Sequence, residues 1–189
     1  MVKRKSFAKG LTDILIKQKV LSEAEGETLQ KLFQESPKEY FDDFLLEEGI
    51  VPEEYLLIAL SEYYKVQAVD VVGYFFETFL LHKFPKDVLH RNAFIPMEVD
   101  ENIMIVVASE PDDPQLLSII GDYVSYDIQF RVGIRLHITD SISEYYDLAV
   151  TEVPEDEDLR TERLEERGAR DETLDEEEEF PFSDEDVID

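Results

Sequence analysis

The chain has 189 residues, no cysteine and a formal net charge of −28 at pH 7. Without cysteine it has no disulfide, thiolate nucleophile or cysteine metal site, which is compatible with a cytoplasmic protein. The acidic excess argues against nucleic acid as a partner, because affinity for phosphate backbones comes from clustered lysine and arginine. No run of about 18 apolar residues occurs, so we expect no membrane insertion. The basic start, MVKRKSFAKG, has no apolar run behind it and does not predict a cleaved signal peptide.

Residues 1–65 predict two helix-turn-helix pairs. Ser22 followed by Glu25 is a capping-box pattern, which marks the start of the second helix. Gly49 suits the left-handed position that closes a helix, and Pro52 suits the first position of the helix that follows. The spacing of the apolar residues predicts helices over residues 7–19, 22–35, 41–48 and 52–64.

The two helix pairs align at an offset of 30 residues. Short apolar patterns recur easily, so two unrelated amphipathic pairs are one interpretation. The turns also align, which favours an internal duplication. Three identities support the alignment, namely Asp13 with Asp43, Leu15 with Leu45, and Glu23 with Glu53.

Residues 66–150 predict a small α/β domain in which strands alternate with short helices. Pro96 lies inside one expected strand, which indicates an edge or a bulge there. Thr139 or Asp140 is expected to cap the closing helix. We expect strands over residues 67–72, 94–99, 103–108 and 128–134, and helices over 77–84, 85–91, 111–123 and 139–148.

From Thr151 to Asp189 the sequence has 19 acids and 4 bases, a net charge of −15, and no core pattern. We predict that residues 151–189 form a disordered acidic tail. Such a tail favours a basic protein surface as partner, and competition for that surface is one functional hypothesis. The fold class is therefore α+β: a helical-hairpin repeat, a small α/β domain with about three to four strands and flanking helices, and the tail.

Three stretches carry a resemblance to a known family. They are LLEEGIVPEEYLLIALSEYY, FPKDVLHRNAFIPMEVDENIMIVVASEPDDPQLL and IQFRVGIRLHITDSISEYYD. Together they resemble the N-terminal domain of type II secretion and type IV pilus assembly ATPases, over about residues 10–150. The resemblance implies a helical first part and an α/β second part. It also implies docking at the cytoplasmic side of the machine, commonly on an inner-membrane partner, and in some members binding of cyclic di-GMP.

The sequence contains no catalytic motif. There is no G-x-x-x-x-G-K-[ST], so the family's ATPase domain is absent from this sequence, and we expect no enzyme. The chain either stands alone or was cut before that domain, and the acidic tail in place of a linker favours the first. His82, His90 and His137 are too scattered to predict a metal site.

A cyclic di-GMP site needs arginine to pair with phosphate or guanine, and glycine for a close backbone approach. The resemblance implies R-L-G at the start of each repeat and glutamine at its end. Here these positions are Gly10-Leu11-Thr12, Tyr40-Phe41-Asp42 and Tyr63. Both arginines are missing, and Asp42 adds negative charge. We expect no cofactor; if cyclic di-GMP binds, the degenerate motif assigns Leu11, Phe41, Gly49, Leu56 and Leu60.

The dense aromatic set favours protein docking, because tyrosine and phenylalanine are enriched at interfaces. The expected docking residues are Tyr74, Phe75, Phe76 and Phe79. We therefore interpret the chain as a non-catalytic docking module in the cytoplasm, held at the inner membrane by a protein. Through the resemblance, its expected partner is an inner-membrane platform component or a related ATPase. The alternative is a cyclic di-GMP sensor.

Overall fold

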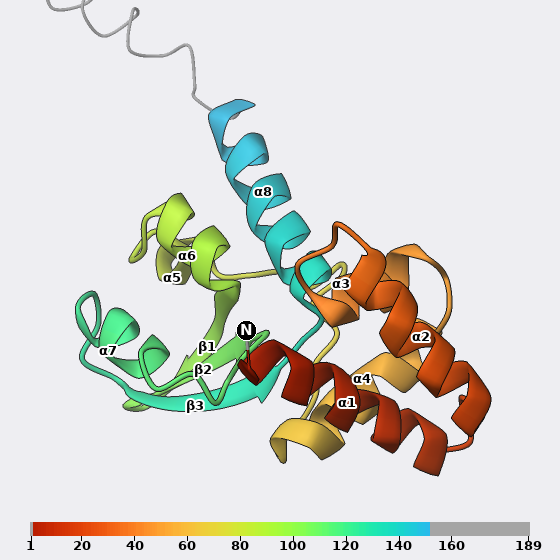
Figure 1. The fold of residues 1–189 in the computed structure, drawn as a ribbon. Helices are drawn as coiled ribbons and strands as arrows, with labels where there is room; N and C mark the ends of the chain where they lie inside the picture. Colours follow the sequence, from red (N-terminus) through yellow and green to blue (C-terminus); the bar gives the residue numbers. More distant parts are fainter. Residues whose placement is uncertain (1, 152–189) are drawn as a thin grey trace, which may run out of the picture. The chain divides into compact units, whose positions relative to one another are not determined.

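The computed structural model describes residues 2–151, with side chains over residues 6–147, and Met1–Leu148 form one compact unit. The described chain is α+β, as predicted (Figure 1). The predicted acidic tail lies, from residue 152 on, outside the described residues. The domain boundaries at 65 and 150 stay predictions. The helices are α1 (Val2–Lys17), α2 (Glu23–Glu35), α3 (Phe41–Glu47), α4 (Glu53–Tyr64), α5 (Thr78–Leu81), α6 (Lys86–Asn92), α7 (Leu116–Gly121) and α8 (Arg135–Thr151). The strands are β1 (Phe94–Asp100), β2 (Ile103–Ala108) and β3 (Asp127–Val132).

The two helix pairs α1–α2 and α3–α4 have the same turn at the predicted offset of 30 residues. Lys19 and Gly49 both adopt left-handed backbone, with φ of 61° and 62°. The Lys19 N–H donates to Ile16 at 2.9 Å, and the Gly49 N–H donates to Leu46 at 3.0 Å. In the first turn the Val20 N–H donates to the Leu15 carbonyl, and in the second the Ile50 N–H donates to the Leu45 carbonyl, both at 3.0 Å. The helical repeat is thus present in the backbone and not only in the apolar pattern.

The second helix of each pair begins differently. The Ser22 hydroxyl accepts from the Glu25 N–H, and the Glu25 carboxylate accepts from the Ser22 N–H, which confirms the capping box. Pro52 was predicted as the first helical residue, but it is extended, with ψ of 144°, and precedes α4. Its carbonyl instead accepts the N–H of Leu56 at 3.1 Å, as an N-cap residue does.

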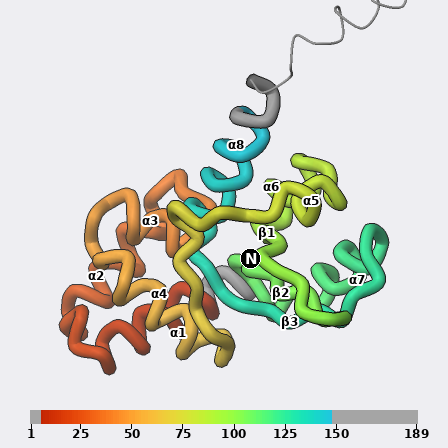
Figure 2. The backbone as a smooth tube through the Cα atoms, turned by 180° about the vertical axis from the view of Figure 1, so that it is seen from behind, coloured from red at the N-terminus to blue at the C-terminus, as the bar shows by residue number. Residues whose placement is uncertain are grey.

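The helix pairs enclose a core of their own. Leu11, Leu15, Leu45, Leu56 and Leu60 are fully buried in it. Two residues from the α/β part, at the end of β3 and just after it, belong to the same cluster, namely Val132 and Ile134. The segment from α4 to α5 runs from the helix pairs to the α/β part (Figure 2). Shared apolar burial therefore joins the two parts.

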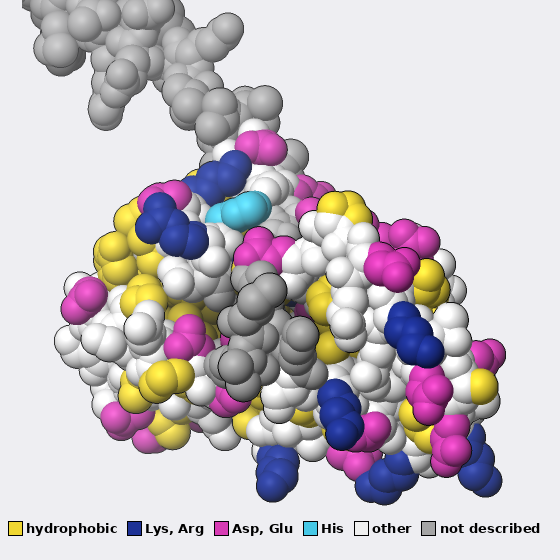
Figure 3. Space-filling model, viewed as in Figure 1, with side chains coloured by type: hydrophobic (Ala, Val, Ile, Leu, Met, Phe, Trp, Pro, Cys, Tyr) yellow, Lys and Arg dark blue, Asp and Glu magenta, His cyan; other side chains and the backbone are white. Residues whose placement is uncertain are grey.

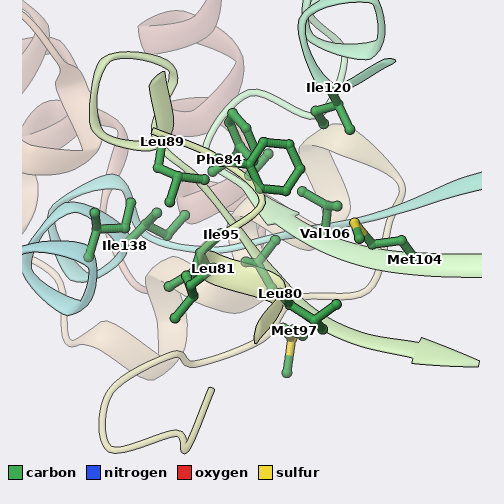
Figure 4. Close-up of a cluster of buried hydrophobic side chains, with 14 of the residues drawn as sticks. Leu80, Leu81, Phe84, Leu89, Ile95, Met97, Met104, Val106, Ile120 and Ile138 are labelled. Atoms are coloured by element: carbon green, nitrogen blue, oxygen red, sulfur yellow. The ribbon is translucent and has the colours of Figure 1, made fainter. Parts of the chain in front are cut away.

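The three strands form one sheet in the order β1-β2-β3. β1 and β2 pair antiparallel across a tight turn, and β2 and β3 pair parallel. The register shifts between Pro96 and Glu98, so the predicted irregularity at Pro96 is confirmed. Side chains of α5, α6, α7 and α8 cover the sheet in a second core (Figure 4). Among those in the figure are Leu80, Leu81, Phe84, Ile95, Val106 and Ile138.

The helix expected over residues 111–123 is shorter in the structure, where α7 is Leu116–Gly121. One further predicted strand and the start of the last predicted helix differ because side chains redirect the backbone. Residues 67–72 were expected as a strand, yet they form only the bridge of Ala68 to Val132. The Asp70 carboxylate accepts the Val72 N–H at 3.0 Å, an Asx turn that ends the pairing. The last helix starts at Arg135, not at a Thr139 or Asp140 cap. The Thr139 hydroxyl instead donates to the carbonyls of Arg135 and Leu136, inside α8.

The left-handed backbone at Lys19 predicts a stabilising substitution. A non-glycine residue in this conformation costs roughly 1 kcal/mol. We expect Lys19→Gly to raise the free energy of unfolding by about 0.5–1 kcal/mol, measured by urea denaturation. The matched control is Lys31→Gly in the interior of α2, which should lower it by about 1 kcal/mol. Equal losses in the free energy of unfolding for the two variants would contradict the left-handed backbone at Lys19.

Candidate functional site

A pocket of about 290 Å³ lies where the helix pairs meet the α/β part. Its walls come from α1, α2, the start of α3, the end of α4, the loop after β2 and the start of α8. Six aromatic residues, four carboxyl residues, one serine and one arginine line it. A concave, largely aromatic site with a few convergent polar groups is the usual form of a small-ligand site.

The aromatic residues of the pocket pack on one another. The ring centroids of Phe7 and Tyr63 are 5.1 Å apart with the rings edge-on, and those of Tyr63 and Tyr64 are 4.9 Å apart. Tyr63 also lies against Gly10, where an added Cβ would come within 2.6 Å of the ring. Position 10 therefore accommodates glycine because the Tyr63 ring occupies the space beside it.

Arg135, at the start of α8, places its charge over an aromatic ring. Its guanidinium carbon is 3.7 Å from the centroid of the Tyr40 ring, a cation–π contact. Ser109 is near the same guanidinium, with its hydroxyl oxygen 3.4 Å from an Arg135 nitrogen. The arrangement joins the start of α3 to the start of α8.

Two neighbouring carboxyl groups, Asp42 and Asp43, face the start of α8. Asp42 is only 5% exposed, and this burial raises its pKa. Its own backbone, the backbone of Arg135 and the Arg135 charge each oppose that rise. Burial and then the charge of Asp42 raise the pKa of Asp43 to about 7. The Asp43 Oδ1 atom is buried and accepts no hydrogen bond. Burial thus favours the protonated form of both groups.

The sequence-predicted nucleotide residues are not gathered in this pocket. Leu11, Leu56 and Leu60 are fully buried in the helical core, and Gly49 lies in the exposed turn. Of the five, only Phe41 lines the pocket. Their assignment as ligand residues stays a prediction. The positions that depart from the motif do line it, namely Tyr40, Asp42 and Tyr63, together with residues that sequence analysis missed, namely Ser109, Glu110, Asp112 and Arg135.

The sequence-predicted docking residues lie in and just before α5, outside the pocket. Phe75 is 97% exposed and Phe79 is 54% exposed. Tyr74 is also exposed and packs against Phe76, with ring centroids 4.9 Å apart. The Lys83 ammonium lies 4.9 Å from the centroid of the Phe79 ring. In Figure 3, hydrophobic side chains gather over the α5–α6 side of the molecule, beside lysine and arginine side chains.

No group of three or more His, Cys, Asp or Glu residues within the described part of the chain could hold a metal ion. His137 lies between two carboxylates, with its Nε2 3.6 Å from Glu53 and its Nδ1 3.7 Å from Asp70. This cluster joins α8 to the start of α4 and to the segment after it. Over the described residues, no helix is long and apolar enough to cross a membrane.

Comparisons with known proteins agree with the resemblance that the sequence predicts. Residues 77–152 match the model of the MshEN domain family. The fold is similar to the structure of MshE with cdg (cyclic di-GMP), with a TM-score of 0.57 and 18% identity, over 72% of this chain and 98% of that one. It is also similar to the N-terminal domain of XpsE, with a TM-score of 0.52 and 17% identity, over 71% of this chain and 92% of that one. No curated protein matches the sequence.

These matches confirm the resemblance to the N-terminal domain of secretion and pilus ATPases. The family match covers α5 to α8, and the two structural similarities, at this identity, concern the fold alone.

The carboxyl pair predicts a pH dependence of stability. The folded chain keeps the Asp43 proton between pH 3.8 and about 7, where the unfolded chain has lost it. The free energy of unfolding therefore falls as the pH rises through this window and is lowest above it. We expect Asp43→Asn to reduce the fall in the free energy of unfolding between pH 5 and pH 8. At pH 8 the variant should be more stable than the unmodified chain by about 1–2 kcal/mol, after allowing for solvent screening.

Urea denaturation between pH 5 and pH 8 measures this effect. The matched control is Asp13→Asn, because Asp13 occupies the equivalent position in the first helix pair and is exposed. It changes the net charge by the same amount and should keep the slope of the unmodified chain. Identical pH profiles for the two variants would show that general charge repulsion, and not the buried pair, sets the slope.

Proposed function

We propose that the chain is a non-catalytic docking module that acts in the cytoplasm, at the cytoplasmic face of a secretion or pilus machine. The observation that carries this proposal is the exposure of Phe75 and Phe79 on one surface. The match to the MshEN domain family supports the choice of machine. A protein partner holds the chain at the inner membrane.

The surface before α5 has the composition of an interface core. A phenylalanine that is 97% exposed contributes nothing to the hydrophobic core and costs solubility. Aromatic anchors of this kind supply much of the binding energy of an interface once a partner buries them. Lys83 beside Phe79 adds a polar rim.

The partner we propose is the cytoplasmic region of an inner-membrane platform component, or a related ATPase. Its complementary surface is an apolar groove for the aromatic residues, with basic residues farther out, where they face the acidic remainder of the chain and not Lys83. The net charge of −28 favours such a surface, because opposite charge speeds encounter and selects between partners. The acidic tail would contribute to encounter, while the aromatic residues would hold the complex together.

Substitution of the exposed anchor tests the proposal. We expect Phe75→Ala, and more strongly Phe75→Ala with Phe79→Ala, to weaken binding to the partner's cytoplasmic region by at least about tenfold. Biolayer interferometry with the full chain measures the affinity. The matched control is Ile58→Ala on α4, because Ile58 is 55% exposed and lies outside this surface. Unchanged affinity in the Phe75 variant would overturn the proposal.

Removal of residues 151–189 separates the contribution of the acidic tail to partner binding from that of the exposed aromatic residues. A slower association rate with an unchanged dissociation rate is the expected result, because distant charge acts mainly on encounter. Loss of all binding on deletion would make the tail itself the functional part. Unchanged partner affinity and rates would exclude a role for it.

The second candidate is a cyclic di-GMP sensor, which the similarity to the structure of MshE with cdg favours. The pocket argues against it, because four carboxyl groups and one arginine line the walls. Two phosphates need arginine, and additional carboxylates repel them. We expect no heat of binding when the chain is titrated with cyclic di-GMP at tens of micromolar, with an authentic binder as positive control. A saturable heat of binding would make the cyclic di-GMP sensor the favoured function and the docking module the second candidate.

A further inference from the structure

The two edges of the sheet differ in how they are protected against pairing with another strand. On β1, Pro96 removes one backbone donor, and the register shift between Pro96 and Glu98 disturbs the strand. β3, at the other edge, is regular and contains no proline (Figure 1). Residues 67–69 cover only its last residue, through the bridge of Ala68 to Val132. The part of β3 before Val132 is therefore an edge without such protection.

The backbone groups of β3 point alternately toward β2 and away from the sheet. The Val132 N–H donates to the Gln67 carbonyl at 3.0 Å, so Val132 points away from the sheet. Those of Ile128 and Phe130 point the same way, because the direction alternates along a strand. Over residues 2–151, no backbone group beyond the sheet accepts the Ile128 or Phe130 N–H. The Phe130 carbonyl accepts from the Arg131 side chain at 3.3 Å, a contact that a second strand must replace.

The side chains of β3 carry an acid near its start and a base near its end. Side chains alternate between the two faces, so Asp127, Gln129 and Arg131 share one face of the sheet. Ile128 and Phe130 share the other face and pack against the second core. The order along the edge, an acid and then a base four residues later, is complementary to itself when one strand is reversed.

Asp127 and Arg131 keep their charge in the described part of the chain. No ion pair among the described residues involves either of them. The exposed Asp127 carboxylate accepts a hydrogen bond from the neutral Asn102 amide at 3.2 Å, through one of its two oxygens. The half-buried Arg131 side chain donates to the Phe130 carbonyl, which is also neutral. Both charges are therefore available to a partner.

We propose that β3 pairs antiparallel with β3 of a second copy of this chain, around a two-fold axis at Gln129. In this register Asp127 faces Arg131 of the second copy, and Ile128 faces Phe130 of the second copy. The symmetry repeats each contact. The backbone groups of Ile128 and Phe130 exchange four hydrogen bonds across the axis. The two Asp127–Arg131 contacts fall at pairs without hydrogen bonds, where facing side chains come closest.

Charge selects this register over its neighbours. A shift of the second copy by two residues in either direction places Asp127 opposite Gln129 or Gly133 and removes both ion pairs. The bridge of Ala68 to Val132 ends the free edge, so the paired stretch is short and buries little surface. The net charge of −28 also repels a second copy. We therefore expect a weak dimer, with a Kd on the order of 100 μM.

This pairing surface shares no residue with the aromatic docking residues before and in α5. A dimer would carry two docking surfaces, and simultaneous engagement of both would raise the apparent affinity for a partner that offers two sites. The dimer does not rest on the proposed docking function, and either proposal can fail without the other.

Two opposite charge variants test the pairing, by sedimentation velocity of the full chain over a concentration series. Asp127→Lys and Arg131→Glu each place like charges opposite one another at both contacts and should weaken self-association at least about tenfold. A one-to-one mixture of the two variants places opposite charges at both contacts and should associate about as tightly as the unmodified chain. General charge repulsion predicts the reverse for Asp127→Lys, which makes the chain less negative and would strengthen association.

A single cysteine at the axis gives a second test, because the chain has no cysteine of its own. The Cα atoms of a facing pair without hydrogen bonds are about 4.5 Å apart, which is within the range for a disulfide. Gln129→Cys should therefore form a disulfide-linked dimer under mild oxidation. The matched control is Glu98→Cys, which is exposed on β1 and should remain largely a monomer.

Hydrogen exchange separates a second copy from other occupants of the edge. The Ile128 and Phe130 amides should exchange slowly at high protein concentration and rapidly at low concentration. Protection that does not depend on concentration would assign the edge to the same chain and overturn the proposal, and its loss on deletion of residues 152–189 would identify the tail as the occupant. Unchanged association in both charge variants, or a mixture of folded variants that does not associate, would also overturn it.

Discussion

The contact of Asp42 and Asp43 with the start of α8 is the constraint on which the arrangement of the two parts depends. The backbone N–H groups at a helix start lack partners within the helix and carry partial positive charge. Here the backbone of Arg135 and that of Leu136 favour the charged forms of Asp42 and Asp43, against the burial that raises both pKa values. The carboxylates of α3 thus do for α8 what a local cap residue would do.

That contact also explains why the pocket is where it is. It brings Arg135 against Tyr40 and places the loop after β2 opposite the ends of α1 and α4. The aromatic rings then fill the space that the helix pairs leave, with Tyr63 over Gly10. The burial that fixes this geometry has an electrostatic cost, because two adjacent carboxyl groups lose solvent together. The pKa values of both groups are raised because of this loss of solvent.

Local signals in the sequence were sufficient for most of the helices and strands. Ser22 with Glu25, Gly49 and Pro96 each act through their own neighbours, so their effects are readable from a few residues. The start of α8 was missed because its capping groups lie about 90 residues earlier in the sequence. The strand expected over residues 67–72 failed because the Asp70 side chain competes for a backbone N–H. In the pocket, the repeat alignment located Tyr40, Asp42 and Tyr63, whereas Glu110, Asp112 and Arg135 join them only through tertiary packing.

The departures from the family's ligand motif have a physical meaning that the motif alone does not give. Replacing arginine and glycine by Tyr40 and Asp42 removes the charge and the open backbone that a phosphate needs. The structure places both replacements in one pocket, with Tyr63 and two further carboxylates from the α/β part. The positions that match the family's arginine and glycine therefore line this pocket with an aromatic ring and a carboxyl group. Leu11, Leu45, Leu56 and Leu60 are buried in the helical core and do not line the pocket. The pocket and the helical core share side chains, because Phe41 is buried in that core and also lines the pocket.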